Sequence, residues 1–300
     1  MNPTPCDPPA RARPAASFRP ARPLRRTRWL ALGVSALALA GCSGSGGPPP
    51  AHPIRDSATL LSAIRARAAR VPSVRAEGSV EHFGRQGRVR GNITIFVMQP
   101  DRVRVDTFAF GHLVSSMVLN AEHFTLLQGQ EYVTGPARAC VAAQLLGVAL
   151  EPREVLAVLS GGVPLVSERI SAPVWENDGY SVRVEGDDGQ SERIEFTLPS
   201  AERSLPEAEQ HPQVHRVVLN DRQGQRGVIT YEAYRTVNGI PFPQRVHIEM
   251  PRDHADTMLR FDTITPNYTI PPNPDAPDAP LPDPFQQTRP AGAHDVPINC

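Results

Sequence analysis

The sequence predicts a mainly β protein in which one curled antiparallel sheet is accompanied by a few short helices. Apolar and polar residues alternate over about a dozen short segments, as expected for strands that have one buried face. The turns between these segments are too short for parallel crossovers, so the strands must pair antiparallel. A sheet of this size curls and has a concave face. We expect an apolar cavity on that face, and a tightly packed sandwich is the alternative.

The globular part of the chain is predicted to span residues 54–265, because most of the 33 prolines lie outside it. The 300 residues carry 31 basic and 31 acidic side chains, and none of the basic ones is lysine. Seven of the arginines lie in residues 1–41 beside one acid, so the remainder of the chain is acidic. This charge balance argues against a nucleic-acid partner.

The N-terminus has the organisation of a secretory signal, which we assign to residues 1–41. A proline- and arginine-rich region, residues 1–28, precedes the apolar run Trp29–Ala40. This run is too short for a permanent bilayer-spanning helix, which needs about 20 residues. A basic region followed by a short apolar run is instead typical of a secretory signal peptide.

The end of this signal, Leu39-Ala-Gly-Cys42, resembles the lipobox of bacterial lipoproteins. The resemblance implies that Cys42 is diacylated and becomes the first residue after cleavage. The alternative is an ordinary signal peptide that has a cysteine near its end. Residues 42–53 are rich in Gly, Ser and Pro and are predicted to form a lipid-anchored flexible tether. In bacterial lipoproteins an Asp after the cysteine often indicates inner-membrane retention, so Ser43 favours the outer membrane.

The globular part opens with an amphipathic helix. Apolar residues recur at helical spacing from Ile54 to Val71, arginines occupy the other side, and Pro72 ends the run. Either Asp56 or Ser57 is suited to cap its start.

Two groups of strands follow, separated by a helical break. Within the break, Ala137–Gly147 predicts one short helix, and a second begins at Pro152 and ends before Gly161. The predicted strands are Ser73–Phe83, Val89–Met98, Asp101–Phe108, Leu113–Asn120, His123–Leu127, Tyr132–Thr134, Tyr180–Glu185, Glu192–Leu198, Val214–Asn220, Gly227–Tyr234, Arg245–Met250 and Thr257–Ile264.

Two cysteines remain in the mature chain besides the lipidated one. Because a secreted chain meets an oxidising compartment, Cys140 and Cys300 can form a disulfide. Such a bond would hold the proline-rich C-terminal tail, residues 266–300, against the body. Two unpaired cysteines are the alternative, since a thiol in an apolar run such as that around Cys140 is ordinary.

The chain lacks the common motifs of catalysis. It has neither a glycine-rich nucleotide loop nor the Gly-x-Ser-x-Gly elbow of serine hydrolases. His211 and His215 have a metal-ligand spacing, but Pro212 argues against the helix that this spacing requires. The other histidines, His82 and His247 among them, are scattered and are predicted to lie at the surface or at strand edges. We therefore expect no enzyme activity, no cofactor and no metal site.

The segment from Thr107 to Val114 is unusually apolar for the short connection between two strands. Turns there are normally polar, whereas this one presents Phe108, Phe110 and Leu113 around Gly111. One interpretation is a continuing strand whose aromatic side chains are buried. The other is an exposed apolar tip that contacts lipid or a hydrophobic partner.

Three features together are similar to LolB-like outer-membrane lipoprotein receptors and their LolA relatives. They are the lipobox with the opening helix, the segment Val74–Val80 that leads into hairpins, and the segment Leu145–Gly161. The resemblance covers residues 54–265 and implies a half-open β-barrel with a helical lid, whose cavity holds acyl chains. It further implies a periplasm-facing monomer that receives acylated lipoproteins from a LolA-like carrier and inserts them into the outer membrane.

The resemblance also assigns roles to particular residues. It places Phe110, Gly111 and Leu113 in a membrane-insertion loop, although the family usually has Leu where Phe110 stands. The predicted cavity lining lies on one face of two adjacent strands, and ordinary core beneath the lid is the alternative for each member: Ile93, Ile95, Val97, Val103 and Val105. A scaffold lipoprotein that binds a protein partner with the same fold is the alternative function. The tail after residue 265 has no counterpart in the family.

Overall fold

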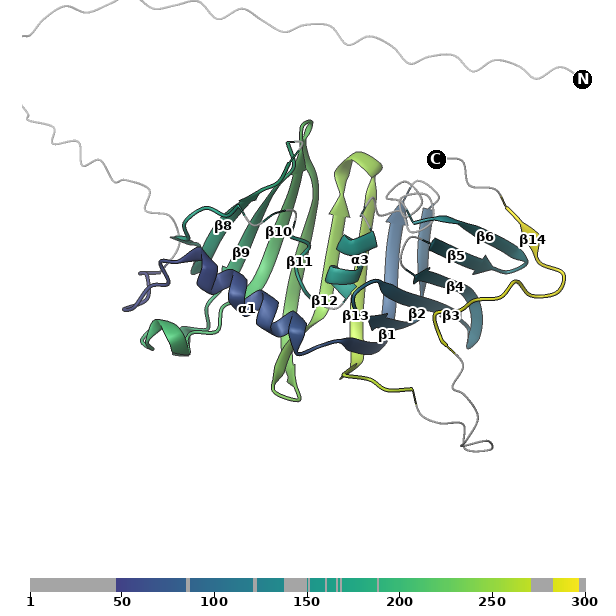
Figure 1. Ribbon diagram of the computed structural model, residues 1–300, viewed down its shortest axis with the longest axis horizontal. Coiled ribbons are helices and arrows are strands. Elements are labelled where there is room, and N and C mark those ends of the chain that lie inside the picture. The colour runs from purple at the N-terminus through teal and green to yellow at the C-terminus, as the bar shows by residue number, and fades with distance from the viewer. Residues whose placement is uncertain are drawn as a thin grey trace, which may run out of the picture. The chain divides into compact units, whose positions relative to one another are not determined.

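The computed structural model describes residues 47–84, 87–120, 123–137, 150, 152–159, 161–165, 167, 169–187, 189–270 and 283–296. Within them, all strands belong to one sheet of 14 strands (Figure 1). Its order is β14-β6-β5-β4-β3-β2-β1-β13-β12-β11-β10-β9-β8-β7. The bounds are β1 Ser73–Gly84, β2 Gly87–Met98, β3 Arg102–Ala109, β4 His112–Asn120, β5 His123–Gln128, β6 Glu131–Pro136, β7 Val174–Glu176, β8 Gly179–Glu185, β9 Ser191–Thr197, β10 Gln213–Asp221, β11 Gly224–Val237, β12 Ile240–Met250, β13 Ala255–Pro266 and β14 His294–Asp295.

Two antiparallel meanders build this sheet. Strands β1 to β6 form one and β7 to β13 form the other, and the two join where β1 pairs with β13. The meanders end at opposite edges, so the chain must return across the sheet between β6 and β7. The sheet is curled and does not close (Figure 1). The predicted class, a half-open antiparallel barrel with a helical lid, is confirmed.

The helices lie on the concave side of the sheet. Helix α1 (Ser57–Ala69) is capped by Asp56, whose carboxylate accepts a hydrogen bond from the Ala58 amide at 2.9 Å. Helix α3 (Pro152–Leu159) lies on the return from β6 to β7 (Figure 1). The helix expected over Ala137–Gly147 lies outside the described residues beyond its first position. The described residues also contain three short 3-10 helices: η1 Ser200–Glu202, η2 Glu207–Glu209 and η3 Pro251–Asp253.

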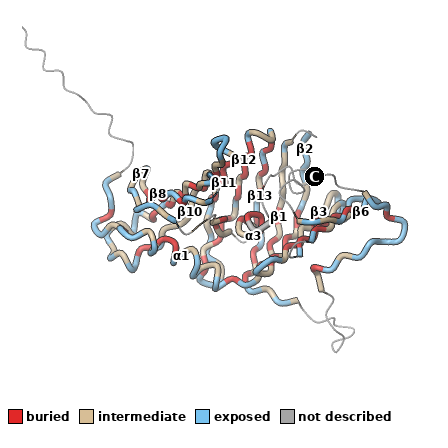
Figure 2. Tube along the Cα trace, turned by 45° about the horizontal axis from the view of Figure 1, so that its top comes forward, coloured by how far each residue is buried: buried red, intermediate tan, exposed pale blue. Residues whose placement is uncertain are grey.

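The core follows from the alternation of side chains along the strands. Residues on the concave face of both meanders pack with α1 and α3 in one apolar cluster. Buried positions alternate with more exposed ones along the strands (Figure 2). In β9, for example, Ile194 and Phe196 are buried and the intervening Glu195 is not. Gly78 has a steric role at the seam between the meanders, because a Cβ atom there would lie 1.8 Å from the Arg260 carbonyl oxygen.

The segment predicted as a flexible tether is bound to the domain from residue 47 onward. The Gly47 amide donates to an Asp178 carboxylate oxygen at 2.7 Å, and the Ala51 amide donates to the Arg203 carbonyl at 3.0 Å. The Gln210 side-chain amide donates to the carbonyl of His52 at 2.7 Å. These hydrogen bonds join residues 47, 51 and 52 to the domain in this structure.

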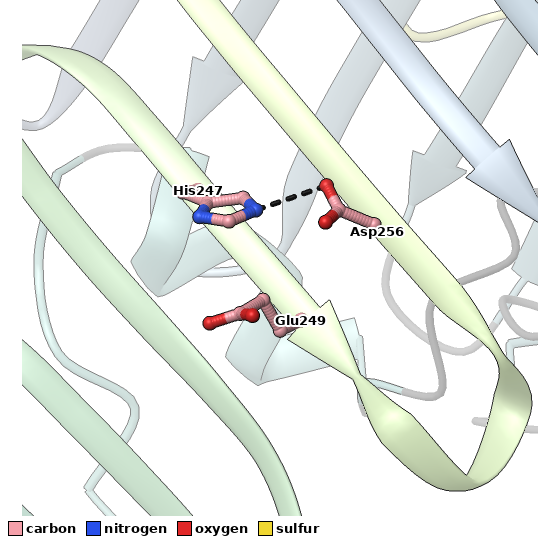
Figure 3. Close-up of side chains that lie close together, drawn as sticks. All are labelled: His247, Glu249 and Asp256. Carbon is pink, nitrogen blue, oxygen red and sulfur yellow. Dashed lines mark hydrogen bonds and ion pairs between the residues drawn. The ribbon is translucent and has the colours of Figure 1, made fainter.

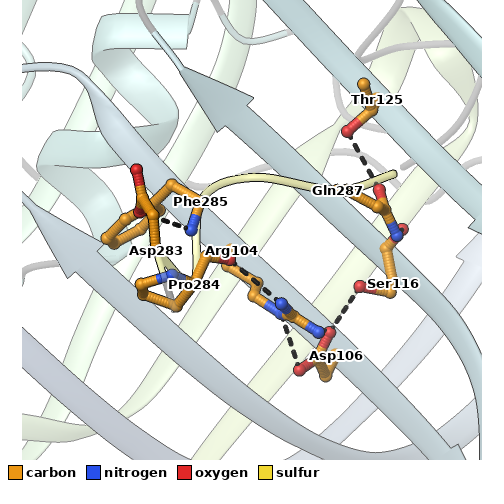
Figure 4. Close-up of polar contacts among 8 residues, drawn as sticks. All are labelled: Arg104, Asp106, Ser116, Thr125, Asp283, Pro284, Phe285 and Gln287. Atoms are coloured by element: carbon orange, nitrogen blue, oxygen red, sulfur yellow. Dashed lines mark hydrogen bonds and ion pairs between the residues drawn. The ribbon is translucent and has the colours of Figure 1, made fainter. Parts of the chain in front are cut away.

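Part of the proline-rich tail also packs on the sheet. Residues 283–287 lie against the face opposite the core, where Phe285 is buried (Figure 4). Farther along the chain, β14 adds to the edge strand β6 in parallel. Arg104 donates to the Pro284 carbonyl at 3.0 Å, and the Gln287 side chain donates to the Ser116 carbonyl at 3.1 Å. Strands β7 and β14 were not predicted, because each is too short to show alternation.

Candidate functional site

The predicted cavity-lining residues lie together on the concave face of β2 and β3. Ile95 lies opposite Val105 in the antiparallel register, and Val97 lies opposite Val103. Four of the five are at most 3% exposed, and Val105 is partly buried against them. These residues form core in this structure, which corresponds to the alternative that the sequence left open.

Helix α3 fills the centre of the concave face. Its Leu156 and Val158 are buried in the core cluster. A void of about 10 Å³ remains between this helix and the sheet. The lining of this void belongs to α3, β1, β12 and β13 and includes none of the five predicted residues: Val74, Ala76, Leu159, Gly161, Phe242, Pro243, Phe261 and Ile264. The predicted lining along β2 and β3 does not border this void.

Four polar side chains hold α3 and the glycines that follow it, and we refer to them as the lid contacts. Glu154 on α3 forms an ion pair with Arg226 on β11. Arg67 on α1 donates to the Gly161 carbonyl at 2.5 Å, and Tyr231 on β11 donates to the Gly162 carbonyl at 2.8 Å. The sequence shows no sign of these contacts, since they join segments far apart in the chain.

Two of the lid contacts, Arg67 and Tyr231, lie in an apolar environment. Burial lowers the pKa of Arg67 and raises that of Tyr231 well above its usual value. The Arg67 guanidinium lies 4.9 Å from the centre of the Phe242 ring, and it also donates to the Pro241 carbonyl at 3.1 Å. One arginine thus connects α1, the end of α3 and β12.

The tip between β3 and β4 is a two-residue turn made by Phe110 and Gly111. Both have positive φ, 50° and 79° respectively. The Phe110 side chain is fully exposed, with a relative accessibility of 103%, and Leu113 and Val114 next to it are 48% and 40% exposed. Asn-Gly is the usual occupant of such turns. Phe110 is therefore an exposed aromatic residue where a polar turn residue is usual.

The remaining predicted site residues are not brought together by the described structure. Cys42, Cys140 and Cys300 all lie outside it. His211 precedes β10, with its Nδ1 atom 3.6 Å from a Glu202 carboxylate oxygen, and is highly exposed. Among the described helices, none combines the length and the apolar character that crossing a bilayer demands.

Comparison with solved structures supports the fold. No protein-family model matches the chain, and no curated protein sequence does so. The structure is similar to that of a DUF1329 family protein from Desulfovibrio piger, with a TM-score of 0.52, 8% identity, and coverage of 73% of this chain and 95% of that chain. A LolA superfamily protein from Nitrosomonas europaea matches with a TM-score of 0.49, 9% identity, and coverage of 72% and 96%. At 8% identity, the likeness to the Desulfovibrio piger protein shows the fold alone.

Proposed function

We propose that this protein is an acyl-chain-binding lipoprotein, anchored in the outer membrane through Cys42, that accepts lipoproteins and inserts them into that membrane. The observation that carries the proposal is the apolar concave face of an unclosed sheet, covered by a short helix that polar contacts hold in place. The role is one of binding and transfer, and it needs no nucleotide, because apolar burial supplies the driving force.

Binding requires α3 to move. Pockets for small molecules are about 300–1,000 Å³ in volume, so the void of about 10 Å³ beneath α3 holds no acyl chain. When the lid contacts break and α3 swings away, Leu156 and Val158 leave the sheet, and the face that carries Ile95 and Val103 becomes open to a chain. Burial of one C16 chain contributes roughly 10 kcal/mol at ~0.8 kcal/mol per CH₂, which opposes the free energy lost with these helix contacts.

Delivery takes place at the membrane surface. The anchor at Cys42 keeps the domain, a monomer, at the periplasmic side of the outer membrane. A LolA-like carrier brings acylated lipoproteins to it there. Phe110 and Leu113 at the β3–β4 tip then enter the lipid and lead the acyl chains out. The full exposure of Phe110 supports this step, because no part of the described domain covers its ring.

Native mass spectrometry with lipid extraction tests the proposal, using the compact unit that begins at Ser43. We expect a copurified acyl ligand, or uptake of a triacylated peptide, that is lost in Val105→Trp and in Ile95→Trp because the added rings occupy the concave face. Arg183→Trp, on the exposed face of β8, is the matched control and should retain the ligand. A folded protein that takes up no acylated peptide would overturn the proposal.

One observation favours a second candidate, a scaffold lipoprotein that binds a protein partner. The side chains of this protein fill the concave face beneath α3, as expected if no ligand enters there. A scaffold should bind its partner equally well with Phe110→Asp, whereas an acceptor with that change should still take up acyl chains and fail to release them into vesicles.

A further inference from the structure

We infer that His247, Glu249 and Asp256 form a binding site for one divalent transition-metal cation of the Zn²⁺ class (Figure 3). This inference is independent of the proposed function. His247 and Glu249 are two residues apart on β12 and project from the face of the sheet opposite the core, since Val246, Ile248 and Met250 between and beside them are buried. Asp256 on β13 lies directly opposite Glu249 in the register.

The geometry is close to that of a metal site. His247 Nε2 lies 2.9 Å from an Asp256 carboxylate oxygen, and one ligand atom from each of the three residues lies within 4.8 Å of the others. Zinc bonds of about 2.0–2.2 Å in a tetrahedral arrangement separate neighbouring ligand atoms by about 3.3 Å. An entering ion therefore needs to part the imidazole and the Asp256 carboxylate by a few tenths of an ångström, while Glu249 moves closer by side-chain rotation.

The charges around the cluster also favour a cation. Like charges directly opposite each other in a sheet are destabilising, and Glu249 and Asp256 form such a pair. In the described part of the chain, neither carboxylate pairs with an arginine. Two arginines on this face of β12 and β13 are engaged elsewhere: Arg245 pairs with Glu232 at 3.3 Å, and Arg260 with Glu81 at 3.8 Å.

The donor set selects the chemical class of the ion. One imidazole with two carboxylates suits zinc and its neighbours, whereas magnesium and calcium prefer oxygen donors alone. Three protein ligands leave a coordination position for water or for an external group. Because the ligands come from two strands, the ion would also link β12 to β13 close to the turn that joins them.

Isothermal titration of the full-length chain in detergent with Zn²⁺ tests the inference, using protein without a histidine tag. We expect saturable binding of one ion per chain. Loss of even an outer-shell partner costs about 10- to 100-fold in metal affinity, so His247→Ala should weaken binding at least tenfold. Glu249→Gln, which keeps size and shape, should also weaken it and serves as the second variant if His247→Ala does not fold.

His211→Ala is the matched control, because His211 is an exposed imidazole beside a carboxylate at another place in the domain. Its affinity for Zn²⁺ should equal that of the unaltered protein. Absence of saturable binding, or binding that survives both His247→Ala and Glu249→Gln, would overturn the inference.

Discussion

Phe110 occupies a backbone conformation that costs free energy, and its side chain gains no burial within the described domain. A left-handed conformation costs a residue other than glycine about 1–2 kcal/mol, and Phe110 has φ of 50°. Its ring is fully exposed, so packing does not offset this cost. Strained residues of this kind cluster at functional sites. The turn therefore presents an aromatic ring at the expense of stability, which supports the proposed membrane-inserting role.

Replacement of this residue should separate stability from function. Phe110→Asn places a residue that tolerates the left-handed region at the same turn position, so the free energy of unfolding should rise by about 1 kcal/mol. Urea denaturation measures this gain. Transfer of an acylated peptide into vesicles should fall at the same time, because the apolar tip is gone.

The control for that change is Val174→Asn, which removes another exposed apolar side chain, 57% accessible, from the edge strand β7. It should leave transfer unchanged. If Phe110→Asn and the unaltered chain transfer the acylated peptide into vesicles equally well, the β3–β4 tip has no role in transfer.

Arg67 on α1 contacts both β12 and the residues that follow α3. It donates to the carbonyl groups of Gly161 and Pro241 from a desolvated position. Arg67→Met keeps the apolar part of the side chain and removes both donors. Since a hydrogen bond to a charged group contributes about 1.5–3 kcal/mol, we expect the free energy of unfolding to fall by about 2–4 kcal/mol.

The same substitution should accelerate uptake of a fluorescent fatty acid, measured by stopped flow, because α3 opens more readily. Arg65→Met, on the exposed side of α1, is the matched control. A destabilised Arg67→Met protein with unchanged uptake would show that Arg67 supports the fold without controlling the lid.

At the scale of elements, the pairing of β1 with β13 joins the two meanders and contains a partly buried histidine, His82. His82 Nδ1 lies 2.8 Å from the Thr257 hydroxyl oxygen. Burial lowers the pKa of His82 below its ordinary value of 6.5, and the nearby Asp256 opposes that shift. The unfolded chain therefore takes up this proton more readily than the folded one.

The sign of the pH effect follows from this difference. The contribution of His82 to stability is fully present above pH 6.5 and is lost as the pH falls through the folded-state pKa. His82→Gln should make the free energy of unfolding fall less between about pH 7.5 and about pH 5. Urea denaturation across this range measures the slope, and an unchanged slope would contradict the assignment.

The C-terminal segment is a second element with a testable role. Because β14 runs parallel to β6, with the Val296 amide donating to the Tyr132 carbonyl at 3.0 Å, the chain approaches Cys300 alongside the strand that leads to Cys140. We predict a disulfide between these cysteines. Peptide mapping of the unreduced, alkylated protein should detect the linked pair, and alkylation of both thiols before reduction would exclude it.

The strands could be predicted from the sequence because alternation is a local property. In segments such as Ile194–Phe196, the alternation of apolar and polar residues predicts which face of the strand is buried. Register is not local, since it depends on which strands pair and on every bulge between them. This is why neither the lid contact of Arg67 nor the cross-strand approach of Asp256 to His247 was predicted, and why both became visible only in three dimensions.

At the scale of the whole molecule, topology explains the position of the lid. The first meander ends near one edge of the sheet, at β6, and the second begins at the other edge, at β7. The segment that connects them must therefore cross one face of the sheet. The concave face offers apolar surface, and α3 covers it with Leu156 and Val158. The sequence predicted a helical cover over the concave face. How far side chains fill the space beneath α3 depends on tertiary packing, which no local sequence pattern encodes.

The central claim is that an acyl chain takes the place of α3 on the concave face. Photo-crosslinking tests it most directly, with a triacylated peptide that carries a diazirine near the end of one acyl chain. The account predicts crosslinks on that face, at residues such as Ile95, Val103 and Phe242, and fewer of them when Val105→Trp occupies the space. Crosslinks confined to the outer face, or none in a folded protein, would contradict it.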